Sequence, residues 1–317
     1  MKISGFSMVR NGIKLYYPVV EMIKSILPIV DEFVIAIGRG DEDDDTRDKI
    51  IEIDDPKIKI IDTVWDLEKY PRGMENAHQT DIAKENCSGD WLFYLQADEV
   101  VHERYLPLIK SRCEELLDTE EVEGILFKYL HFWGDYHHYQ KSHGWYPHEI
   151  RIIRNDPEIH SWESAQSFRK IPDFDGNNYR QQEGTYKLKV APIEAYIYHY
   201  GWVRPPHLMT NKKKALDTVH KGSDKVEEMY KNVENVFDYG PLDRLAEFKS
   251  SHPKVMQNMI NQMDWEDKLQ YQGKPNPNRK LHKHEKLKYR ILTWIEQNLL
   301  GGKQIGGFKN YKLIKGI

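Results

Sequence analysis

The sequence has few cysteines and no long apolar run, and both features narrow the class of protein. Cys87 and Cys113 are the only cysteines among 317 residues, which argues against a disulfide framework and against a zinc site built on cysteine. No stretch approaches the roughly 20 consecutive apolar residues of a membrane-spanning helix. The opening residues, MKISGFSMVRNG, hold charges and glycines where a secretory signal needs an apolar run. We therefore expect a protein that stays in the cytoplasm.

The composition suits a folded protein, but its charge is unevenly placed. Apolar residues make up 39% of the chain and charged residues 30%, which is typical of globular domains. The net charge is −4, yet the segment from Lys274 to the end holds 11 Lys and Arg against two Asp and Glu. A basic tail on an acidic body can bind a membrane surface, a polyanion or the body itself.

Short apolar runs alternate with helical patterns in the first half of the chain. Apolar residues at helical spacing from Leu15 to Val30 predict one helix, and Met74–Cys87 predicts another. The predicted strands are Lys2–Val9, Glu32–Gly38, Ile58–Ile61, Trp91–Leu95, Gly124–Tyr129, Glu149–Arg154 and Ile193–Tyr200. This alternation predicts an α/β fold with a central, mostly parallel sheet flanked by helices. Ligands of such sheets bind beyond the C-terminal ends of the strands.

The last third of the chain has a different pattern. From Met209 onward it is helical and polar, Gln272–Arg279 has the composition of a linker, and Lys286–Leu300 predicts a basic amphipathic helix. This helix could rest on an anionic membrane or pack against the acidic body. The tail holds no recognisable nucleic-acid-binding module, so we expect no nucleic-acid partner.

A carboxylate stands directly after the predicted strand WLFYL, in Gln96-Ala97-Asp98-Glu99. This is the place where an α/β sheet binds a metal–diphosphate group. Mg²⁺ and Mn²⁺ prefer oxygen ligands and bind through one or two carboxylates plus substrate phosphates. The alternative is an acid that caps the next helix.

Two further segments follow strand ends. In the acidic loop GRGDEDDDTRD, residues 38–48, a carboxylate could accept hydrogen bonds from a ribose or a base, or the loop could simply be solvated. His199, in YHYGW, could bind a metal or act as an acid or base, or could be a core histidine. Arg204 and Lys212 follow it and could neutralise a leaving diphosphate or lie on a solvated helix face.

The candidates for a general base are acids near the strand Glu149–Arg154. Glu163 and Glu149 are the main candidates, and Asp135 is a weaker third. Each could deprotonate an acceptor hydroxyl if it lies within hydrogen-bond reach of that proton. The alternative for each is an acid paired at the surface.

Taken in order, these segments resemble the family 2 glycosyltransferases of the GT-A (Rossmann-like) fold. The resemblance covers residues 1–215, and a mainly helical region with a basic tail, 216–317, follows. The order of short motifs is more specific than any one of them. The segments that carry the resemblance are VRNG, ILPIVDEFVIAIGRGDEDDDT, ENAHQTDIAKENCSGDWLFYLQADEV, HEIRIIRN with HSWES, and IYHYGWVR.

The resemblance implies a role for individual residues. Asp98 matches the family's DxD position, which contacts metal and diphosphate, and Gln96 replaces the first Asp with a neutral oxygen. His199 matches the late histidine that completes metal coordination, and Glu163 matches the acceptor-side acid. The other residues implied to bind the donor are Val9, Arg10, Asp41, Asp43, Asp44, Ala97, Arg204 and Lys212.

The resemblance also implies an activity. We expect an enzyme that uses Mn²⁺ or Mg²⁺ to move a sugar from a nucleotide-diphosphate sugar to a glycan or lipid-linked acceptor in polysaccharide biosynthesis, by a single inverting displacement. Two alternatives remain open. One is a sugar-phosphate nucleotidylyltransferase, although SMVRNGIK is a poor match to the Gly-rich, basic loop that such enzymes need. The other is a non-catalytic module that binds glycan or nucleotide. Gln96 supports this alternative because it replaces the first Asp of the motif.

Overall fold

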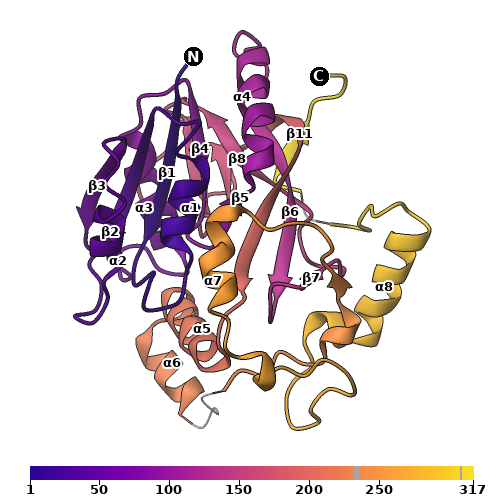
Figure 1. The fold of residues 1–317 in the computed structure, drawn as a ribbon. Helices are drawn as coiled ribbons and strands as arrows, with labels where there is room; N and C mark the ends of the chain where they lie inside the picture. Colours follow the sequence, from indigo (N-terminus) through magenta and orange to yellow (C-terminus); the bar gives the residue numbers. More distant parts are fainter. Residues whose placement is uncertain (232–235, 308) are drawn as a thin grey trace.

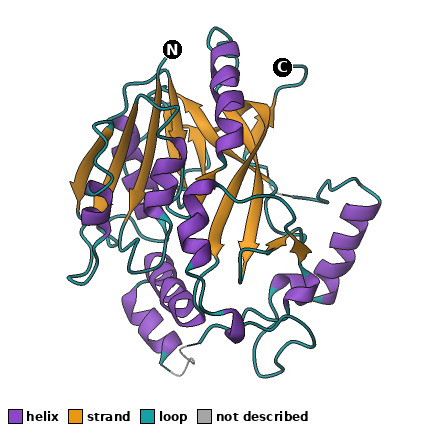
Figure 2. Ribbon diagram, viewed as in Figure 1, coloured by secondary structure: helices purple, strands orange, loops and turns teal. Residues whose placement is uncertain are grey.

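Strands from both halves of the chain form one sheet with helices packed on its faces, as Figures 1 and 2 show. The computed structural model describes residues 1–231, 236–307 and 309–317. The strand order along the main path is β3-β2-β1-β4-β8-β6-β11-β10-β9. The strands of this path are β1 (Ile3–Val9), β2 (Glu32–Gly38), β3 (Ile58–Thr63), β4 (Trp91–Tyr94), β6 (Gly124–Trp133), β8 (His148–Arg154), β9 (Ile159–Trp162), β10 (Ser167–Lys170) and β11 (Tyr186–Trp202).

The N-terminal strands are parallel, as predicted. β1 pairs in parallel with both β2 and β4, and β2 pairs in parallel with β3. The chain moves outward from β1 to β3 and then crosses back to place β4 on the other side of β1. The strand order therefore reverses between β1 and β4, and this reversal is where open α/β sheets bind their ligands.

Alternating side chains of these strands enter two apolar clusters, one on each face of the sheet. On β2, Phe33 and Ile35 join the larger cluster with α1 (Val19–Ile26), while Val34 and Ala36 join the smaller one with α3 (Met74–Glu85). All seven residues of β2 are buried, as expected for a strand covered on both sides. The predicted α/β class, with helices on both faces, is confirmed.

The second half of the sheet is mixed. β8 lies antiparallel between β4 and β6, and the 17-residue β11 runs parallel to β6. β11 is longer than the predicted Ile193–Tyr200, and its C-terminal end lies beside the short β5 (Glu99–Val101). This pairing brings the His199 segment to the Asp98 segment, although a hundred residues of chain separate them.

The first helix is shorter than predicted. Pro18 precedes α1 as its N-cap, and Tyr16 adopts a positive φ of 60°, so Leu15 lies in a turn and not in the helix. The remaining helices are α2 (Thr46–Ile51), α4 (Leu106–Glu115), α5 (Pro206–Lys221), α6 (Ser223–Tyr230), α7 (Gln257–Asn261) and α8 (Leu287–Asn298).

The region after α5 combines helices with long irregular connections. It also returns to the sheet, because β13 (Tyr311–Leu313) pairs in parallel with β11, and β12 (Ala246–Glu247) pairs with β7 (His138–Gln140). The predicted basic helix is present as α8, at the edge of the molecule in Figure 1. Among the described residues, no helix has the length and apolar character to cross a lipid bilayer.

Candidate active site

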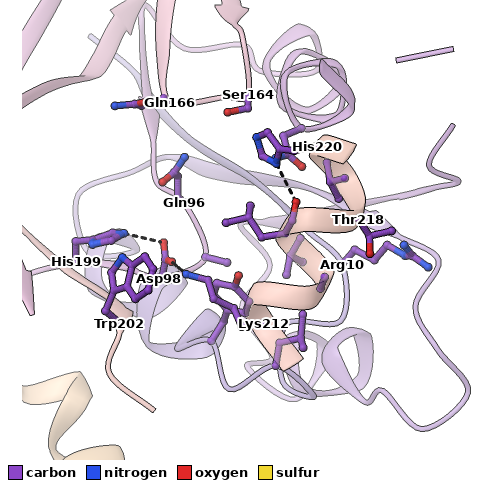
Figure 3. A pocket seen from close by; sticks show the side chains of 18 of the residues that line it. Arg10, Gln96, Asp98, Ser164, Gln166, His199, Trp202, Lys212, Thr218 and His220 are labelled. Carbon is purple, nitrogen blue, oxygen red and sulfur yellow. Dashed lines mark hydrogen bonds and ion pairs between the residues drawn. The ribbon is translucent and has the colours of Figure 1, made fainter. Parts of the chain in front are cut away.

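A cleft of about 830 Å³ opens at the C-terminal ends of β1 and β4, where the strand order reverses. Figure 3 shows the side chains that meet there. Its lining comes from many parts of the chain that are far apart in sequence. They include residues 8–11 after β1, 96–98 after β4, 144–146 before β8, the end of β11 with Trp202, α5, and the segment 282–284.

Asp98 lies in a short turn between β4 and β5. Its backbone carbonyl accepts a hydrogen bond from the Tyr200 N–H at 2.8 Å, and its neighbour Glu99 pairs with His199 across β5 and β11. Asp98 itself is only 7% exposed. The sheet therefore fixes the backbone of this turn on both sides.

Glu99 faces away from the cleft and anchors the turn. Its carboxylate accepts two hydrogen bonds of 2.7 Å from the Arg151 guanidinium and one of 2.8 Å from the Tyr129 hydroxyl. Both members of the ion pair are fully buried. Each buried charge has hydrogen-bonded partners, which such charges require. Of the two adjacent acids, only Asp98 is directed into the cleft.

The carboxylate of Asp98 lies close to the imidazole of His199, with 3.7 Å between Oδ1 and Nε2 (Figure 3). The buried His131 sets the tautomer of this imidazole. His131 Nε2 lies 2.8 Å from the Tyr146 carbonyl oxygen and must donate to it, because a carbonyl only accepts. Burial lowers the pKa of His131 well below its ordinary value, so its Nδ1 is unprotonated and accepts from His199 Nδ1–H at 3.2 Å.

His199 is therefore expected to present an unprotonated Nε2 to Asp98. Burial lowers the pKa of His199, against the pull of the Asp98 charge. Burial alone would raise the pKa of Asp98, but the net direction is downward, with the Lys212 and Arg204 cations among the causes that lower it. A carboxylate oxygen and an imidazole lone pair thus face each other, and two acceptors at this distance need a cation between or beside them.

The carboxylate of Asp98 and the imidazole of His199 are ligands that suit a divalent metal, with substrate phosphates as its further ligands. Among the described residues, no group of three or more His, Cys, Asp and Glu side chains is placed to hold a metal. Two protein ligands plus substrate phosphates are, however, the usual environment of Mg²⁺. Gly201 leaves the space open, since a Cβ there would lie 2.6 Å from Asp98 Oδ2 and 2.7 Å from His199 Nε2.

This close approach predicts the effect of a single methyl group. We expect Gly201→Ala to lower kcat/KM about 10²-fold for a reaction catalysed in this cleft, because displacement of Asp98 or His199 by an ångström disrupts alignment. Steady-state kinetics with a responsive substrate would measure the change, and thermal unfolding would confirm that the variant folds. A folded variant with wild-type kinetics would show that this space is not used.

One cation stands at the cleft and another lies behind it. Lys212 Nζ lies 3.8 Å from Asp98 Oδ2 and donates to the Gly201 carbonyl at 2.8 Å. Burial, together with Arg204, lowers the pKa of Lys212 to about 8, so the amine is mostly protonated at pH 7. Arg204 was predicted to bind the donor, but it is fully buried, does not line the cleft, and donates to the Leu15 and Gly201 carbonyls.

The acidic loop contributes one of its three candidate acids to the cleft. Asp41 lines it, together with Val9, Arg10 and Ala97. Asp43 is exposed and pairs with Lys14 at 2.5 Å, and Asp44 accepts hydrogen bonds from the Lys14 N–H and the Thr46 hydroxyl. Neither lines the cleft, and both acids make their contacts with Lys14 and Thr46 around the loop.

The two candidate bases lie just outside the lining. Ser164 and Gln166 line the cleft, whereas Glu163 and Glu149 do not. Glu163 is half-buried, 3.8 Å from Arg180, and has a positive φ of 58°. Such strain in a residue other than glycine tends to occur at functional sites. Asp135, the third candidate, is fully buried, accepts from His138, and also lies outside the lining.

Glu149, behind the lining, and Gln96, within it, both contact the segment 165–166 on this side of the cleft. Burial raises the pKa of Glu149 to about 7, and the Gln166 amide lies 3.3 Å from its carboxylate. Gln96 Nε2 donates to the Ala165 carbonyl at 2.9 Å. Gln96 therefore connects the Asp98 turn to the turn that carries Glu163.

Several lining residues were not predicted from the sequence. Trp133, Trp145 and Trp202 form an aromatic wall, with Trp133 and Trp202 stacked at 4.7 Å. His282 and His284 reach this wall from the C-terminal region. The aromatic stretch around residue 140 was visible in the sequence, but nothing there indicated that its members gather with residues 282–284.

No protein-family model and no curated protein matches the sequence. Solved structures that resemble this one include TarS 1–349 from S. aureus in complex with UDP, at 15% identity over 69% of this chain and 65% of that one, with a TM-score of 0.38. Another is glucosyl-3-phosphoglycerate synthase from Mycobacterium tuberculosis in complex with Mn²⁺ and UDP-glucose, at 19% identity over 41% of this chain and 44% of that one, with a TM-score of 0.29. The chain thus spans less than two thirds of each.

Proposed function

We propose that the protein transfers a sugar from a nucleotide-diphosphate sugar to a hydroxyl group of a glycan or lipid-linked acceptor. The observation that carries the proposal is the meeting of Asp98 Oδ1 and His199 Nε2 at 3.7 Å at the strand reversal of the sheet. The protonated amine of Lys212 lies 3.8 Å from Oδ2, the other oxygen of the same carboxylate. This combination suits the diphosphate of a sugar donor.

The nucleoside would lie along the wall formed after β1. Arg10, Asn11, Asp41 and Trp65 line this part of the cleft, with the Arg10 guanidinium 5.8 Å from the Trp65 ring centroid. The Asn11 side chain accepts from the Asp41 N–H at 2.8 Å and so fixes the start of the acidic loop. An aromatic ring and a carboxylate offer a stacking surface for a base and an acceptor for ribose hydroxyls.

Asp98 and His199 would hold Mn²⁺ or Mg²⁺ together with the diphosphate. When bound, the metal would stabilise the negative charge that develops on the leaving diphosphate. Lys212 adds a fixed positive charge beside the same group, and its position is set by its bond to the Gly201 carbonyl. Its burial excludes water and so strengthens this interaction.

The acceptor would enter along the aromatic wall of Trp145 and Trp202. Tryptophan faces suit sugar rings because they offer a flat apolar surface with a polar edge. Glu163 would take the proton from the acceptor hydroxyl, whose oxygen attacks the anomeric carbon as the bond from that carbon to the diphosphate oxygen breaks. A single displacement of this kind inverts the configuration at the anomeric carbon.

A screen of nucleotide-diphosphate sugars tests the proposal. We expect hydrolysis or transfer of one donor class in the presence of Mn²⁺ and a large loss of rate when a chelator removes the metal. Release of inorganic diphosphate from a nucleoside triphosphate would instead identify a nucleotidylyltransferase. Calorimetric binding of nucleoside diphosphates without turnover of any donor would identify a non-catalytic module.

A further inference from the structure

Helix α8 turns its apolar side to solvent. Leu287, Ile291 and Trp294 are 69%, 52% and 59% exposed. Their spacing of four and three residues places them on one face of the helix. Glu296, on the opposite face, is fully buried. An amphipathic helix packed on a protein core has the reverse arrangement.

Polar contacts fix this orientation. The Glu296 carboxylate lies 2.7 Å from His143 Nδ1 and accepts from the Ile305 N–H at 2.8 Å. On the same side, the Thr293 hydroxyl accepts from the His143 N–H at 2.9 Å. These contacts hold the polar face of α8 against the protein. The exposed apolar stripe, Leu287, Ile291 and Trp294, is therefore directed to solvent by the packing of the helix.

The exposed charged side chains around the stripe are all positive. Between Lys280 and Ile317 the sequence has only two acids, Glu285 and Glu296, and both are buried. Glu285 is paired with the Arg279 guanidinium at 2.6 Å. The basic residues of this segment are all exposed, and they are Lys280, Lys283, Lys286, Lys288, Arg290, Lys303, Lys309, Lys312 and Lys315.

We propose that α8 docks the protein on the surface of an anionic lipid bilayer. The apolar stripe would enter the boundary between headgroups and acyl chains, and Lys288 and Arg290, on its two sides, would meet lipid phosphates. Tryptophan is favoured at this depth of a membrane. A second copy of the chain is a poorer occupant, because it would bring the same positive charge against this face.

The docking helix is joined directly to the cleft. His143, which binds Glu296 and Thr293, precedes Gly144 and Trp145 of the cleft lining. The Gln304 amide, from the segment after α8, donates to the Trp145 carbonyl at 2.5 Å. Docking would therefore place the aromatic wall of the cleft near the bilayer. That the bilayer supplies a lipid-linked acceptor rests on the proposed function, whereas the docking itself does not.

Flotation of the full-length protein with vesicles tests the docking. We expect binding to phosphatidylcholine vesicles that contain phosphatidylglycerol, and weak binding to phosphatidylcholine alone. The triple variant Leu287→Ser/Ile291→Ser/Trp294→Ser and the charge variant Lys286→Glu/Lys288→Glu/Arg290→Glu should each lower the partition coefficient at least about tenfold. The matched control Ile51→Ser/Leu108→Ser, which changes exposed apolar residues on other helices, should bind as the wild type does.

Equal flotation of the wild type and both α8 variants would overturn the docking, as would equal binding to neutral and anionic vesicles. Sedimentation of the wild type as a dimer that the triple variant abolishes would assign the stripe to a second copy instead. Donor hydrolysis in solution, measured on the same variants, separates the two proposals. Loss of vesicle binding with intact hydrolysis supports docking. Lack of hydrolysis in the wild type contradicts the proposed transferase activity and leaves the docking proposal unaffected.

Discussion

Asp98→Asn is expected to lower kcat/KM for donor cleavage about 10³-fold. The substitution keeps the size of the side chain but removes the negative charge that faces His199 Nε2 and Lys212 Nζ at 3.7 and 3.8 Å. A metal would lose its charged oxygen ligand, and the lysine would lose its counter-ion. Kinetics over a range of Mn²⁺ concentrations would measure both losses.

Asp43→Asn is the matched control for this experiment. Asp43 is also an acid near the donor side, but its side chain is 72% exposed and pairs only with Lys14 among the contacts of the described residues. We expect near-normal turnover in this variant. Turnover of Asp98→Asn within a few-fold of the wild type, at saturating donor, would remove Asp98 from the mechanism.

Glu163→Gln is expected to lower kcat between about 10²- and 10⁴-fold, the range for loss of a general base. The amide keeps the shape of the side chain but does not accept a proton. The KM for the donor should change little, because Glu163 is next to Ser164, on the side of the cleft proposed for the acceptor and not on the wall proposed for the nucleoside. Transfer to acceptor and hydrolysis of donor should be measured separately.

Glu149→Gln distinguishes the second candidate base. Because burial raises the pKa of Glu149 to about 7, a mechanism that uses it as the base would gain rate as the pH rises through 7 and would lose that dependence in the variant. We expect Glu149→Gln to transfer sugar far faster than Glu163→Gln. The opposite ranking, in variants that unfold at the same temperature, would assign the proton transfer to Glu149.

The sequence predicted the parts of the site that follow strand ends. β2 and β4 are short apolar runs buried on both faces, so their bounds were visible as Glu32–Gly38 and Trp91–Leu95. The rule that ligands meet the C-terminal ends of strands pointed to Asp98, whereas the pairing of His199 with Asp98 was implied by the resemblance to the glycosyltransferase family. Both residues are in the cleft, although their roles stay predictions.

The remaining parts depend on packing over long distances in the sequence. His131 lies within the apolar strand GILFKYLHFW and resembles a core residue, so its bond to His199 was not visible. Arg204 was expected at the phosphates because it follows the histidine closely, but it stacks on the Tyr17 ring at 4.6 Å instead. His284 reaches the cleft from a segment without hydrophobic periodicity. The local sequence pattern therefore does not predict where this segment packs.

The turn from Gln96 to Glu99 is ordered before any ligand arrives, because Arg151 and Tyr129 hold Glu99 on its far side. A donor that binds there gives up little binding free energy to immobilising the backbone, which favours tight binding for a given number of contacts. The same rigidity limits adaptation. Under the proposed function, a donor with a differently shaped sugar would be accommodated by the aromatic and basic walls, since the turn that would meet the diphosphate is held by its bonds to Arg151 and Tyr129.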